Sequence, residues 1–366
     1  MRAVGILLCA GSASRMGFDK LTEPLAGQTA IERSARALVA GGADALVLAV
    51  NERTRAYAAA LDWQVPCLIV EGGDTRAESV RRALAASEGG VVLIHDAARC
   101  LVWPDLVRRC LESALRYGSG VAAVRATDTA ILETEEGGIA ALPRERLWLT
   151  QTPQAFLLPE IRAAYERQDL AATDDATIYA ASGYTPRFVE STADNFKLTR
   201  MEDWRRAQRL LTRYGTGFDT HRLVAGRPLI LGGIRLPFDR GLLGHSDADV
   251  VAHAVMDALL GAAALGDIGR HFPDTEKAYA GADSIMLLRR VVALLAEKGF
   301  RPAAVDVTVI AEAPKIAPHA AEMRHNLSKA LGIPPDCVSI KATTSEGMND
   351  EGKGLCISAQ AVASVC

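Results

Sequence analysis

The side chains best suited to bind a metal ion lie past the middle of the chain, where an Asp-x-His pair is followed by a further histidine. Asp219 and His221 are two residues apart, so on an extended strand they project from the same face. A carboxylate and two imidazoles suit zinc, and with His253 as third ligand a fourth coordination position stays open for catalysis. The three residues therefore predict a catalytic metal site, although an Asp-x-His pair alone is more often an ordinary surface feature.

The segment that carries His253 is predicted to be a helix, because its apolar residues recur at helical spacing. Ser246 or Asp247 is the expected N-cap, since such side chains accept hydrogen bonds from the first free backbone N–H groups. Asp249, His253 and Asp257 are four residues apart, so they would share one face of the helix. The histidines expected to be hydrogen-bonded structural residues, with no metal role, are His95, His271, His319 and His325.

A second candidate site is the loop of small residues that follows the first apolar run. Residues 4–9 are continuously apolar, as expected of a parallel strand covered on both faces. The backbone of Ala10 and Gly11 can close around a phosphate, and Arg15 and Lys20 add two cations where a triphosphate would lie. The loop has neither the dinucleotide-binding glycine pattern nor a Walker lysine. By itself it is equally compatible with an ordinary strand–helix connection.

Further apolar runs occur at the spacing of an α/β protein, with alanine- and arginine-rich helical segments between them. They predict a doubly wound sheet, whose ligands bind beyond the carboxyl ends of the strands. Gly73 and Ser79 follow one of these runs, and Asp96 ends another. The Asp96 carboxylate could hold a magnesium ion on phosphates, although each such residue could also be a helix cap. The predicted strands cover residues 45–50, 67–70, 91–94 and 120–124.

The second half of the chain begins after a charged amphipathic helix, predicted for residues 200–213 and stopped near residues 214–215. Only a few residues separate this helix from Asp219, so the linker is short. Mixed runs of strand and helix then indicate an α+β layer fold. The chain is therefore expected to contain two domains, residues 1–211 and 216–366. In the second domain, helices are predicted at 247–265, 283–299 and 317–331, and strands at 228–236, 304–310, 337–342 and 355–364.

The bulk composition is that of a globular protein, with 49% hydrophobic and 23% charged residues in a chain of 366. A net charge of −3 gives no reason to expect a nucleic-acid or membrane partner. The seven cysteines are scattered, odd in number and without a C-x-x-C pattern, which indicates reduced thiols. Residues 1–10 resemble a short signal peptide, but the loop that follows favours a buried strand. Because no apolar run approaches about 18 residues, we expect a cytoplasmic protein.

The first half also contains a series of longer motifs. They are Ala10-Gly11 with Arg15-Met16 and Lys20, Gly72-Gly73-Asp74-x-Arg76-x-x-Ser79-Val80, His95-Asp96-Ala97-Ala98-Arg99, Gln151-Thr152-Pro153-Gln154-x-Phe156, Thr173-Asp174-Asp175-Ala176 and Asp194-Asn195-Phe196-Lys197-Leu198-Thr199. Over about residues 1–211 this series resembles the 2-C-methyl-D-erythritol 4-phosphate cytidylyltransferases of the non-mevalonate isoprenoid pathway. Such an enzyme transfers CMP from CTP to methylerythritol phosphate and releases diphosphate.

This resemblance implies roles for individual residues. Arg15 and Lys20 would stabilise the pentavalent α-phosphate of CTP, while Arg144 and Lys197 would hold the methylerythritol phosphate whose oxygen attacks. Nucleotidyl transfer depends mainly on positioning and charge stabilisation, so cations matter more than a general base. The implied nucleotide contacts are Ala10, Gly11, Gly73 and Ser79, with Asp96 on magnesium.

The second half carries its own series of motifs. They are Gly217-Phe218-Asp219-Thr220-His221, Gly241-Leu242-Leu243-Gly244-His245-Ser246-Asp247-Ala248-Asp249, Asp257-Ala258-Leu259-Leu260-Gly261, Gly266-Asp267-Ile268-Gly269, Phe272-Pro273-Asp274-Thr275, Ala313-Pro314-Lys315 and Lys341-Ala342-Thr343-Thr344-Ser345-Glu346. Over about residues 216–366 they resemble the 2-C-methyl-D-erythritol 2,4-cyclodiphosphate synthases. In these enzymes a 2-phosphate attacks the β-phosphate of the same substrate and expels CMP.

By this second resemblance, Asp219, His221 and His253 hold zinc, and His245 and Thr344 lie near the reacting phosphates. Two cations that draw the phosphates together address the main obstacle, because two like-charged groups must meet. Glu346 would hold a second divalent ion, magnesium. The other implied ligand contacts are Ser246, Asp267, Gly269, Phe272, Asp274, Ala311, Lys315, Thr343, Ser345 and Lys353.

Members of the second family are trimers with active sites between subunits. The expected protein is therefore a homo-oligomer built on a trimer of the second domain, with dimer contacts between first domains. Near the three-fold axis the sequence departs from common family residues at Asp350, Lys353 and Gln360. The two activities are non-successive steps of one pathway, and no glycine-rich kinase loop is present for the phosphorylation between them.

Two alternatives remain at this point. The first half could be a different nucleotidyltransferase, acting on a sugar phosphate or a pterin cofactor. One half could instead be an inactive scaffold that only assembles the oligomer. The presence of Arg15, Lys20, Lys197 and the three candidate zinc ligands argues against a scaffold.

Overall fold

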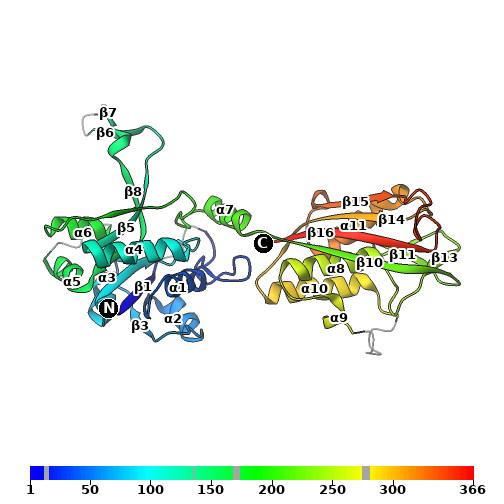
Figure 1. The fold of residues 1–366 in the computed structure, drawn as a ribbon, viewed down its shortest axis with the longest axis horizontal. Helices are drawn as coiled ribbons and strands as arrows, with labels where there is room; N and C mark the ends of the chain where they lie inside the picture. Colours follow the sequence, from blue (N-terminus) through cyan, green and yellow to red (C-terminus); the bar gives the residue numbers. More distant parts are fainter. Residues whose placement is uncertain (12–15, 135–136, 168–173, 274–280) are drawn as a thin grey trace. The chain divides into compact units, whose positions relative to one another are not determined.

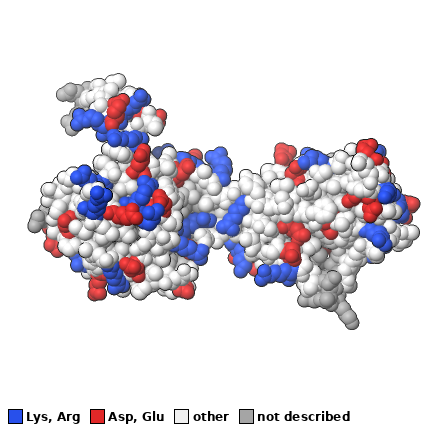
Figure 2. Space-filling view, in the orientation of Figure 1, with Lys and Arg blue, Asp and Glu red and all other residues white. Residues whose placement is uncertain are grey.

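A computed structural model describes residues 1–11, 16–134, 137–167, 174–273 and 281–366 of the chain (Figure 1). The chain divides into two compact units. The first comprises Met1–Glu23 and Gln28–Ala207, and the second comprises Pro24–Gly27 and Gln208–Cys366. The principal boundary thus falls at 207/208, close to the interval of 211–216 expected from the sequence. On the face seen in Figure 2, acidic and basic side chains are interspersed over both units.

The first unit is built on a seven-stranded sheet with the order β3-β2-β1-β4-β8-β5-β9. The four strands from β3 to β4 are parallel, as expected for an α/β nucleotide-binding sheet. Strand β8 runs antiparallel between β4 and β5, and β5 is parallel to β9. The strands are β1 Ala3–Cys9, β2 Ala45–Val50, β3 Cys67–Glu71, β4 Val91–Asp96, β5 Ser119–Arg125, β8 Trp148–Leu157 and β9 Phe188–Glu190.

Strand β8 is absent from the sequence prediction because its buried half is polar. Gln151, Thr152 and Gln154 are buried, yet each is hydrogen-bonded: the amide of Gln154, for example, donates to Asp174 at 2.8 Å. A strand of this kind lacks the apolar run that identifies the others. It brings polar side chains to the same edge of the sheet as the end of β4.

Helices cover both faces of this sheet (Figure 1). On one face, α3, α5 and α6 pack on a cluster that includes Ile6, Ile94 and Phe156. On the other face, Leu38 of α1 lies close to Gly5 of β1. The residues on either side of Gly5, Val4 and Ile6, belong to the first cluster, so Gly5 is on the opposite face of the strand. The helices are α1 Ala30–Ala40, α2 Glu52–Ala59, α3 Arg76–Ala86, α4 Pro104–Tyr117, α5 Leu158–Arg167, α6 Asp175–Ala181 and α7 Met201–Leu211.

A two-stranded arm projects from the first unit (Figure 1). It consists of β6 (Ala130–Glu133) and β7 (Ile139–Leu142), followed by the short 3-10 helix η1 (Arg144–Arg146). Its apolar side chains are largely in solvent, with Ile131 56% and Ile139 75% exposed. A hairpin with exposed isoleucines buries too little apolar surface to be stable alone, so the arm needs a covering surface.

The second unit is a five-stranded sheet with the order β13-β10-β16-β14-β15; α8 and α11 pack on it, and α10 packs against these two helices. This agrees with the expected mixture of helices and strands in one layered domain. The elements are β10 Arg213–Ala225, β11 Leu229–Leu231, β12 Ile234–Leu236, β13 Arg240–Leu242, α8 Val250–Ala262, α9 Ile268–His271, α10 Ser284–Glu297, β14 Pro302–Ile310, α11 Ala320–Leu331, β15 Val338–Thr343 and β16 Cys356–Val365.

The linker expected near residues 214–215 is part of strand β10 instead. Helix α7 ends at Leu211 and β10 begins at Arg213, pairing with β16 from its first residue. Gly217 in this strand allows close packing: a Cβ on it would lie 2.0 Å from the carbonyl oxygen of Ala254 in α8. Gly217 therefore lets the strand that carries Asp219 lie directly against the helix that carries His253.

The predicted N-cap of α8 was also wrong. Neither Ser246 nor Asp247 caps the helix; Asp249 does, with its side chain accepting from the N–H groups of Val251 and Ala252. The Asp249 carboxylate is fully buried and also accepts from Gly232 and Gly233, which fixes it at the helix start. Asp249 therefore lies before the helix rather than within it beside His253.

In the part of the chain that the structure describes, no helix combines the length and the apolar character needed to cross a bilayer.

Candidate active sites

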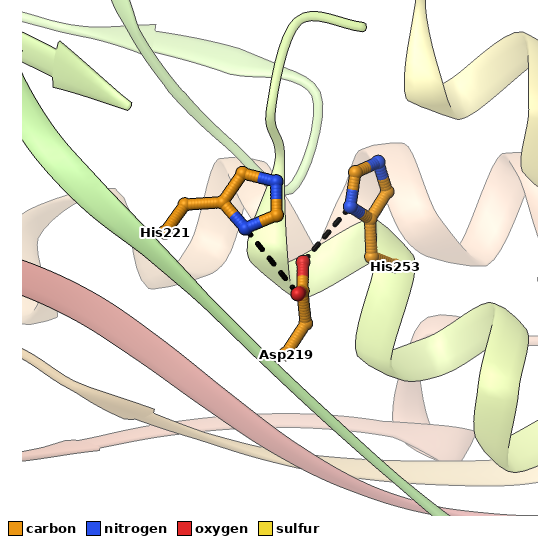
Figure 3. A group of neighbouring side chains, drawn as sticks. All are labelled: Asp219, His221 and His253. Atoms are coloured by element: carbon orange, nitrogen blue, oxygen red, sulfur yellow. Dashed lines mark hydrogen bonds and ion pairs between the residues drawn. The ribbon is translucent and has the colours of Figure 1, made fainter. Parts of the chain in front are cut away.

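The second unit brings Asp219, His221 and His253 together (Figure 3). One ligand atom from each residue lies within 4.8 Å of the others. Asp219 Oδ2 is 2.9 Å from His253 Nδ1, and Asp219 Oδ1 is 3.3 Å from His221 Nδ1. Strand β10 supplies the first two residues on one face and α8 supplies the third. The sequence thus predicted a cluster that the fold assembles.

The electrostatics of this cluster suit a divalent cation. Burial alone would raise the pKa of Asp219, but its interactions with the neighbouring His221 and His253 hold it below its ordinary value. The Asp219 carboxylate is therefore ionised and available as a ligand. His221 Nδ1 lies 2.7 Å from the carbonyl of Thr220, to which it can donate, and this leaves the Nε2 lone pair for a metal. One carboxylate and two imidazoles fit a divalent metal.

A cavity of about 420 Å³ opens beside the three residues. Of the residues that the sequence assigned to substrate, His245, Ser246, Gly269 and Phe272 line it together with the cluster. Asp267 is not among the lining residues; it caps α9, accepting from Arg270 N–H at 3.0 Å. Asp274 lies outside the described residues. The cavity gives a substrate direct access to a metal on Asp219, His221 and His253.

Other predicted residues of the second unit form a separate group at the ends of β14 and β15. Ala311 N–H donates to the carbonyl of Thr343 at 3.0 Å, and Thr344 Oγ1 donates to Glu346 Oε1 at 2.7 Å. None of them lines the cavity beside the metal cluster. Within one chain the predicted site is therefore divided. The members of this second group are Ala311, Lys315, Thr343, Thr344, Ser345 and Glu346, and the exposed Lys353 lies in the turn between β15 and β16.

The first unit has its own cavity, of about 280 Å³, at the carboxyl ends of β1, β3 and β4. The location agrees with the general position of ligands in such sheets. Arg15 lies outside the described residues. The predicted residues that line this cavity are Ala10, Gly11, Lys20, Gly73, Ser79, Asp96 and Lys197.

Ser79 shapes the wall of the first cavity. The N–H of Gly73 donates to Ser79 Oγ at 3.0 Å, and that hydroxyl donates to the carbonyl of Thr75 at 3.0 Å. A Cβ on Gly72 would lie 2.4 Å from the Cβ of Ala10, so glycine allows the two loops to touch. The loop after β3 and the loop after β1 therefore form one continuous wall.

Asp96 at the end of β4 is surrounded by basic side chains. Its carboxylate is 2.9 Å from Lys197 Nζ, 3.1 Å from Arg76 Nε and 3.9 Å from Arg99 Nε. Burial alone would raise the pKa of Asp96, but Arg76 and Lys197 hold it well below its ordinary value. Asp96 is consequently ionised throughout the physiological range.

Arg76 and Asp175 are central to this site and were not assigned by sequence reasoning. Arg76 donates to both oxygens of the fully buried Asp175, at 2.9 and 2.8 Å, while its Nε bonds Asp96. Tyr165 donates a further hydrogen bond to Asp175 at 2.5 Å. Both residues stand in the quoted motifs. Their presence in charge-rich motifs is the signal that could have suggested a role. The pairing itself could not be predicted, because it joins distant parts of the sequence.

Arg144 does not join the other predicted residues of the first unit. It lies on η1 at the base of the arm, its side chain is 55% exposed, and it donates to the carbonyl of Thr127 at 3.4 Å. It is not among the residues that line the cavity.

Two family models divide the chain. The model of 2-C-methyl-D-erythritol 4-phosphate cytidylyltransferase matches residues 3–213, and that of the YgbB family matches residues 212–366. The chain is 46% identical to a "Bifunctional enzyme IspD/IspF" of Anaeromyxobacter dehalogenans, over 99% of this chain and 97% of the relative. It is 41% identical to the protein of that name in Desulforudis audaxviator, over 99% and 96%. A solved structure, the bifunctional IspDF from Campylobacter jejuni, is 30% identical with a TM-score of 0.50 and covers 100% of this chain and 98% of that one.

Proposed function

Because the chain belongs to the family of bifunctional IspD/IspF enzymes, we propose that each of its two activities uses one of the two cavities described above. The protein is an enzyme of isoprenoid precursor synthesis. It transfers CMP from CTP to 2-C-methyl-D-erythritol 4-phosphate and releases diphosphate. It also cyclises 4-diphosphocytidyl-2-C-methyl-D-erythritol 2-phosphate to the 2,4-cyclodiphosphate and releases CMP. The family assignment of both halves decides against a different nucleotidyltransferase and against an inactive scaffold.

Cytidylyl transfer takes place in the first cavity. A phosphate oxygen of methylerythritol phosphate attacks the α-phosphorus of CTP, and the bond to the β-phosphate breaks. Arg15 and Lys20 stabilise the charge on the α-phosphate, and Lys197 holds the attacking phosphate. The support is that Lys20 and Lys197 line one small cavity together with Gly73 and Ser79. The backbone of Ala10 and Gly11, in the same wall, would lie against the nucleotide.

Asp96 would hold the magnesium ion that accompanies CTP, which neutralises phosphate charge when bound. Its carboxylate is ionised and lies at the wall of the cavity. In the structure Lys197 forms an ion pair with it, and the Lys197 side chain is 43% exposed. A lysine with that freedom can turn from Asp96 to the phosphate of the substrate. Arg76 then remains to hold the carboxylate in place.

Arg144 would reach the attacking phosphate in a second copy of the chain. Its exposed position on the arm supports this, as does the apolar arm surface that needs a cover. An arm that packs on the first unit of a partner would carry Arg144 toward the partner's cavity. In this proposal, the dimer contact between first units brings Arg144 of one chain to the active site of the other.

Cyclisation takes place beside Asp219, His221 and His253. The observation that carries this assignment is the convergence of the three ligand atoms next to an open cavity. We assign zinc to these ligands because one carboxylate and two imidazoles form the set that leaves a catalytic position open. When bound, zinc would supply positive charge to bring the two phosphates of the substrate together. His245 would lie near the reacting phosphates, and Asp267 and Gly269 would contact the sugar alcohol, with Ser246 and Phe272 lining the same cavity as His245.

The rear site requires a second copy of the chain. The group at the ends of β14 and β15 does not line the metal cluster's cavity in a single chain, which supports a site completed by a neighbouring subunit of a trimer. In that arrangement Glu346 would hold a magnesium ion, which would neutralise phosphate charge, and Thr344 would contact a phosphate. The remaining members of the group, with Asp274 and Lys353, contact the CMP part or its phosphates: Ala311, Lys315, Thr343 and Ser345. All seven cysteines are free thiols, which supports work in the cytoplasm.

Metal analysis combined with sedimentation tests these assignments. The purified full chain should carry one tightly held zinc ion per chain and sediment as a trimer or a multiple of one. The assignment of the rear site is wrong if the active protein holds no zinc, or if a monomer cyclises the substrate at full rate.

A further inference from the structure

Both ring nitrogens of His253 are engaged. Nδ1 lies 2.9 Å from Asp219 Oδ2, on the side of the metal cluster. On the other side, Nε2 lies 3.0 Å from Ser284 Oγ and 3.2 Å from Ser246 Oγ. The His253 residue is only 7% exposed, so no bulk water replaces these partners. Whether the hydroxyls donate to Nε2 or accept from it therefore decides which ring nitrogen carries the proton.

The hydroxyl hydrogen of Ser284 already takes part in another hydrogen bond. Its hydroxyl donates to Asp247 Oδ1 at 2.5 Å, and its backbone N–H donates to Asp247 Oδ2 at 3.0 Å. Asp247 Oδ1 is the acceptor of the first of these bonds, and a hydroxyl has only one hydrogen to donate. The Ser284 oxygen therefore turns a lone pair, not a proton, toward His253. Ser246 Oγ accepts the N–H of Ala248 at 3.2 Å and lies farther from Nε2 than Ser284 Oγ does, so Ser284 is the nearer partner of that nitrogen.

This arrangement fixes the tautomer of His253. With an acceptor at 3.0 Å, Nε2 carries the hydrogen and Nδ1 carries the lone pair. That lone pair then faces a carboxylate oxygen of Asp219 at 2.9 Å. Two lone pairs at this distance repel one another unless a cation binds both. The protein thus holds Asp219 and His253 ready for a positive ion.

We propose that Asp247 and Ser284 are positioning residues that fix His253 as a metal ligand through Nδ1; the proposal rests on the assignment of the zinc site above. The chain of hydrogen bonds runs from the Asp247 carboxylate through the Ser284 hydroxyl to His253 Nε2. Hydrogen bonds of this kind beyond the ligands set ring orientation and ligand basicity in metal sites.

The two positioning residues are themselves anchored in the fold. Ser284 is fully buried at the first residue of α10. The N–H of Asp247 donates to the carbonyl of Ala282 at 3.1 Å, which ties the loop before α8 to the turn before α10. His253 on α8 is therefore oriented from two neighbouring segments, independently of the strand that carries the other ligands.

Zinc affinity of the full chain tests this proposal. The chain would be stripped of metal and titrated with zinc against a chromophoric chelator. Ser284→Ala and Asp247→Asn should each weaken zinc binding by about 10- to 100-fold, the usual effect of removing such a partner. Ser284→Thr, which keeps the hydroxyl, should bind more tightly than Ser284→Ala. The matched control is Ser328→Ala, which removes a buried hydroxyl in α11 that donates to the carbonyl of His325 at 2.8 Å. Its affinity should equal that of the wild type.

A spectroscopic measurement gives a second readout, made directly on the histidine rings that bind the metal. With cobalt in place of zinc, ring N–H protons of the bound histidines give shifted proton resonances. We expect two such exchangeable resonances, one from His221 and one from His253. In Ser284→Ala the His253 resonance should exchange with solvent faster, whereas Ser328→Ala should leave both unchanged.

The outcomes separate the two proposals. If the wild-type chain binds neither zinc nor cobalt at the cluster, the assignment of the metal site fails. If the wild type binds metal but Ser284→Ala and Asp247→Asn bind it equally well, the positioning role is wrong. An unchanged exchange rate for both cobalt-shifted protons in Ser284→Ala would overturn it as well.

Discussion

Asp96 at the end of β4 and Lys197 in the segment before α7 form an ion pair of 2.9 Å at the wall of the first cavity. When Lys197 leaves, Arg76 and Arg99 still lie beside the buried Asp96 carboxylate. The ion pair can therefore open without leaving the buried negative charge unpaired. We therefore expect Lys197 to be able to leave Asp96 for a phosphate of the substrate.

Replacing Lys197 by alanine should lower cytidylyl transfer by about a hundredfold or more, the scale of losing one group that stabilises the transition state. Cyclisation should be unchanged, because Lys197 belongs to the other unit. Both activities would be assayed on the same preparation by following diphosphate and CMP release with separate substrates. Lys298→Ala, at an exposed helix end, serves as control. Loss of both activities in a folded Lys197 variant would contradict the assignment of independent sites.

Asp219→Ala should have the opposite effect. Removing the carboxylate leaves two imidazoles to hold the metal, so zinc content should fall and cyclisation should drop by at least a hundredfold. Cytidylyl transfer should survive. The control Asp239→Ala removes an aspartate whose side chain is 80% exposed. Stripping the wild type with a chelator should reproduce the Asp219→Ala pattern, and added zinc should restore cyclisation only in the wild type.

Asp175→Asn tests the anchor of Arg76. Breaking a buried, bidentate ion pair costs about 3–5 kcal/mol, because the remaining charge loses its partner. All four tryptophans belong to the first unit, so urea unfolding followed by tryptophan fluorescence reports on that unit. The control Asp105→Asn alters an exposed carboxylate on α4 and should change stability by less than about 1 kcal/mol. Equal unfolding midpoints for the two variants would show that Asp175 is dispensable.

His95 makes the first unit less stable in acid. Burial lowers the pKa of His95 from 6.5 to about 4. Between these values the unfolded chain binds a proton that the folded chain does not, so the free energy of unfolding falls as the pH falls. The loss from this residue between pH 7 and pH 5 should be about 2 kcal/mol. Urea titrations at the two pH values should show this decrease in the free energy of unfolding in the exposed control His325→Asn. The decrease due to His95 should be absent in His95→Asn. An equal loss in both variants would contradict the buried neutral state of His95.

Arg144→Ala should resemble Lys197→Ala when tested alone, with weak cytidylyl transfer and normal cyclisation. If Arg144 acts on a partner's cavity, mixing the two variants under conditions of subunit exchange should restore activity to about a quarter of the sites. The restored rate should not appear when either variant is mixed with itself. Failure of the mixture to recover any transfer, despite demonstrated exchange, would place Arg144 in its own chain's site.

The metal cluster could be predicted from sequence because its information is local. Residues two apart on a strand share a face, and the motif around His253 predicts a helix. The cap of α8 could not be predicted in the same way, since three residues suited to capping lie between positions 246 and 249. Asp249 caps because its carboxylate also binds the backbone of β-hairpin residues 232 and 233, while Asp247 is engaged by Ser284. Those partners are distant in sequence.

The first site shows the same division between local and distant information. Loop positions such as Gly73 and Lys197 stand in recognisable motifs, and the cavity unites them. The polar strand β8 and the pairing of Arg76 with Asp175 depend on which segments meet across the sheet. No periodicity in the sequence predicts which of these distant segments come into contact.

The contact between Gly217 and Ala254 has a consequence for recognising or transplanting this chemistry. The distance between strand and helix is set by main-chain atoms in contact, so any side chain at position 217 would push apart elements that bear different ligands. A chain could keep every metal-binding residue and still be unable to chelate. In a database search or a design, the glycine two positions before the aspartate is as informative as the ligands themselves.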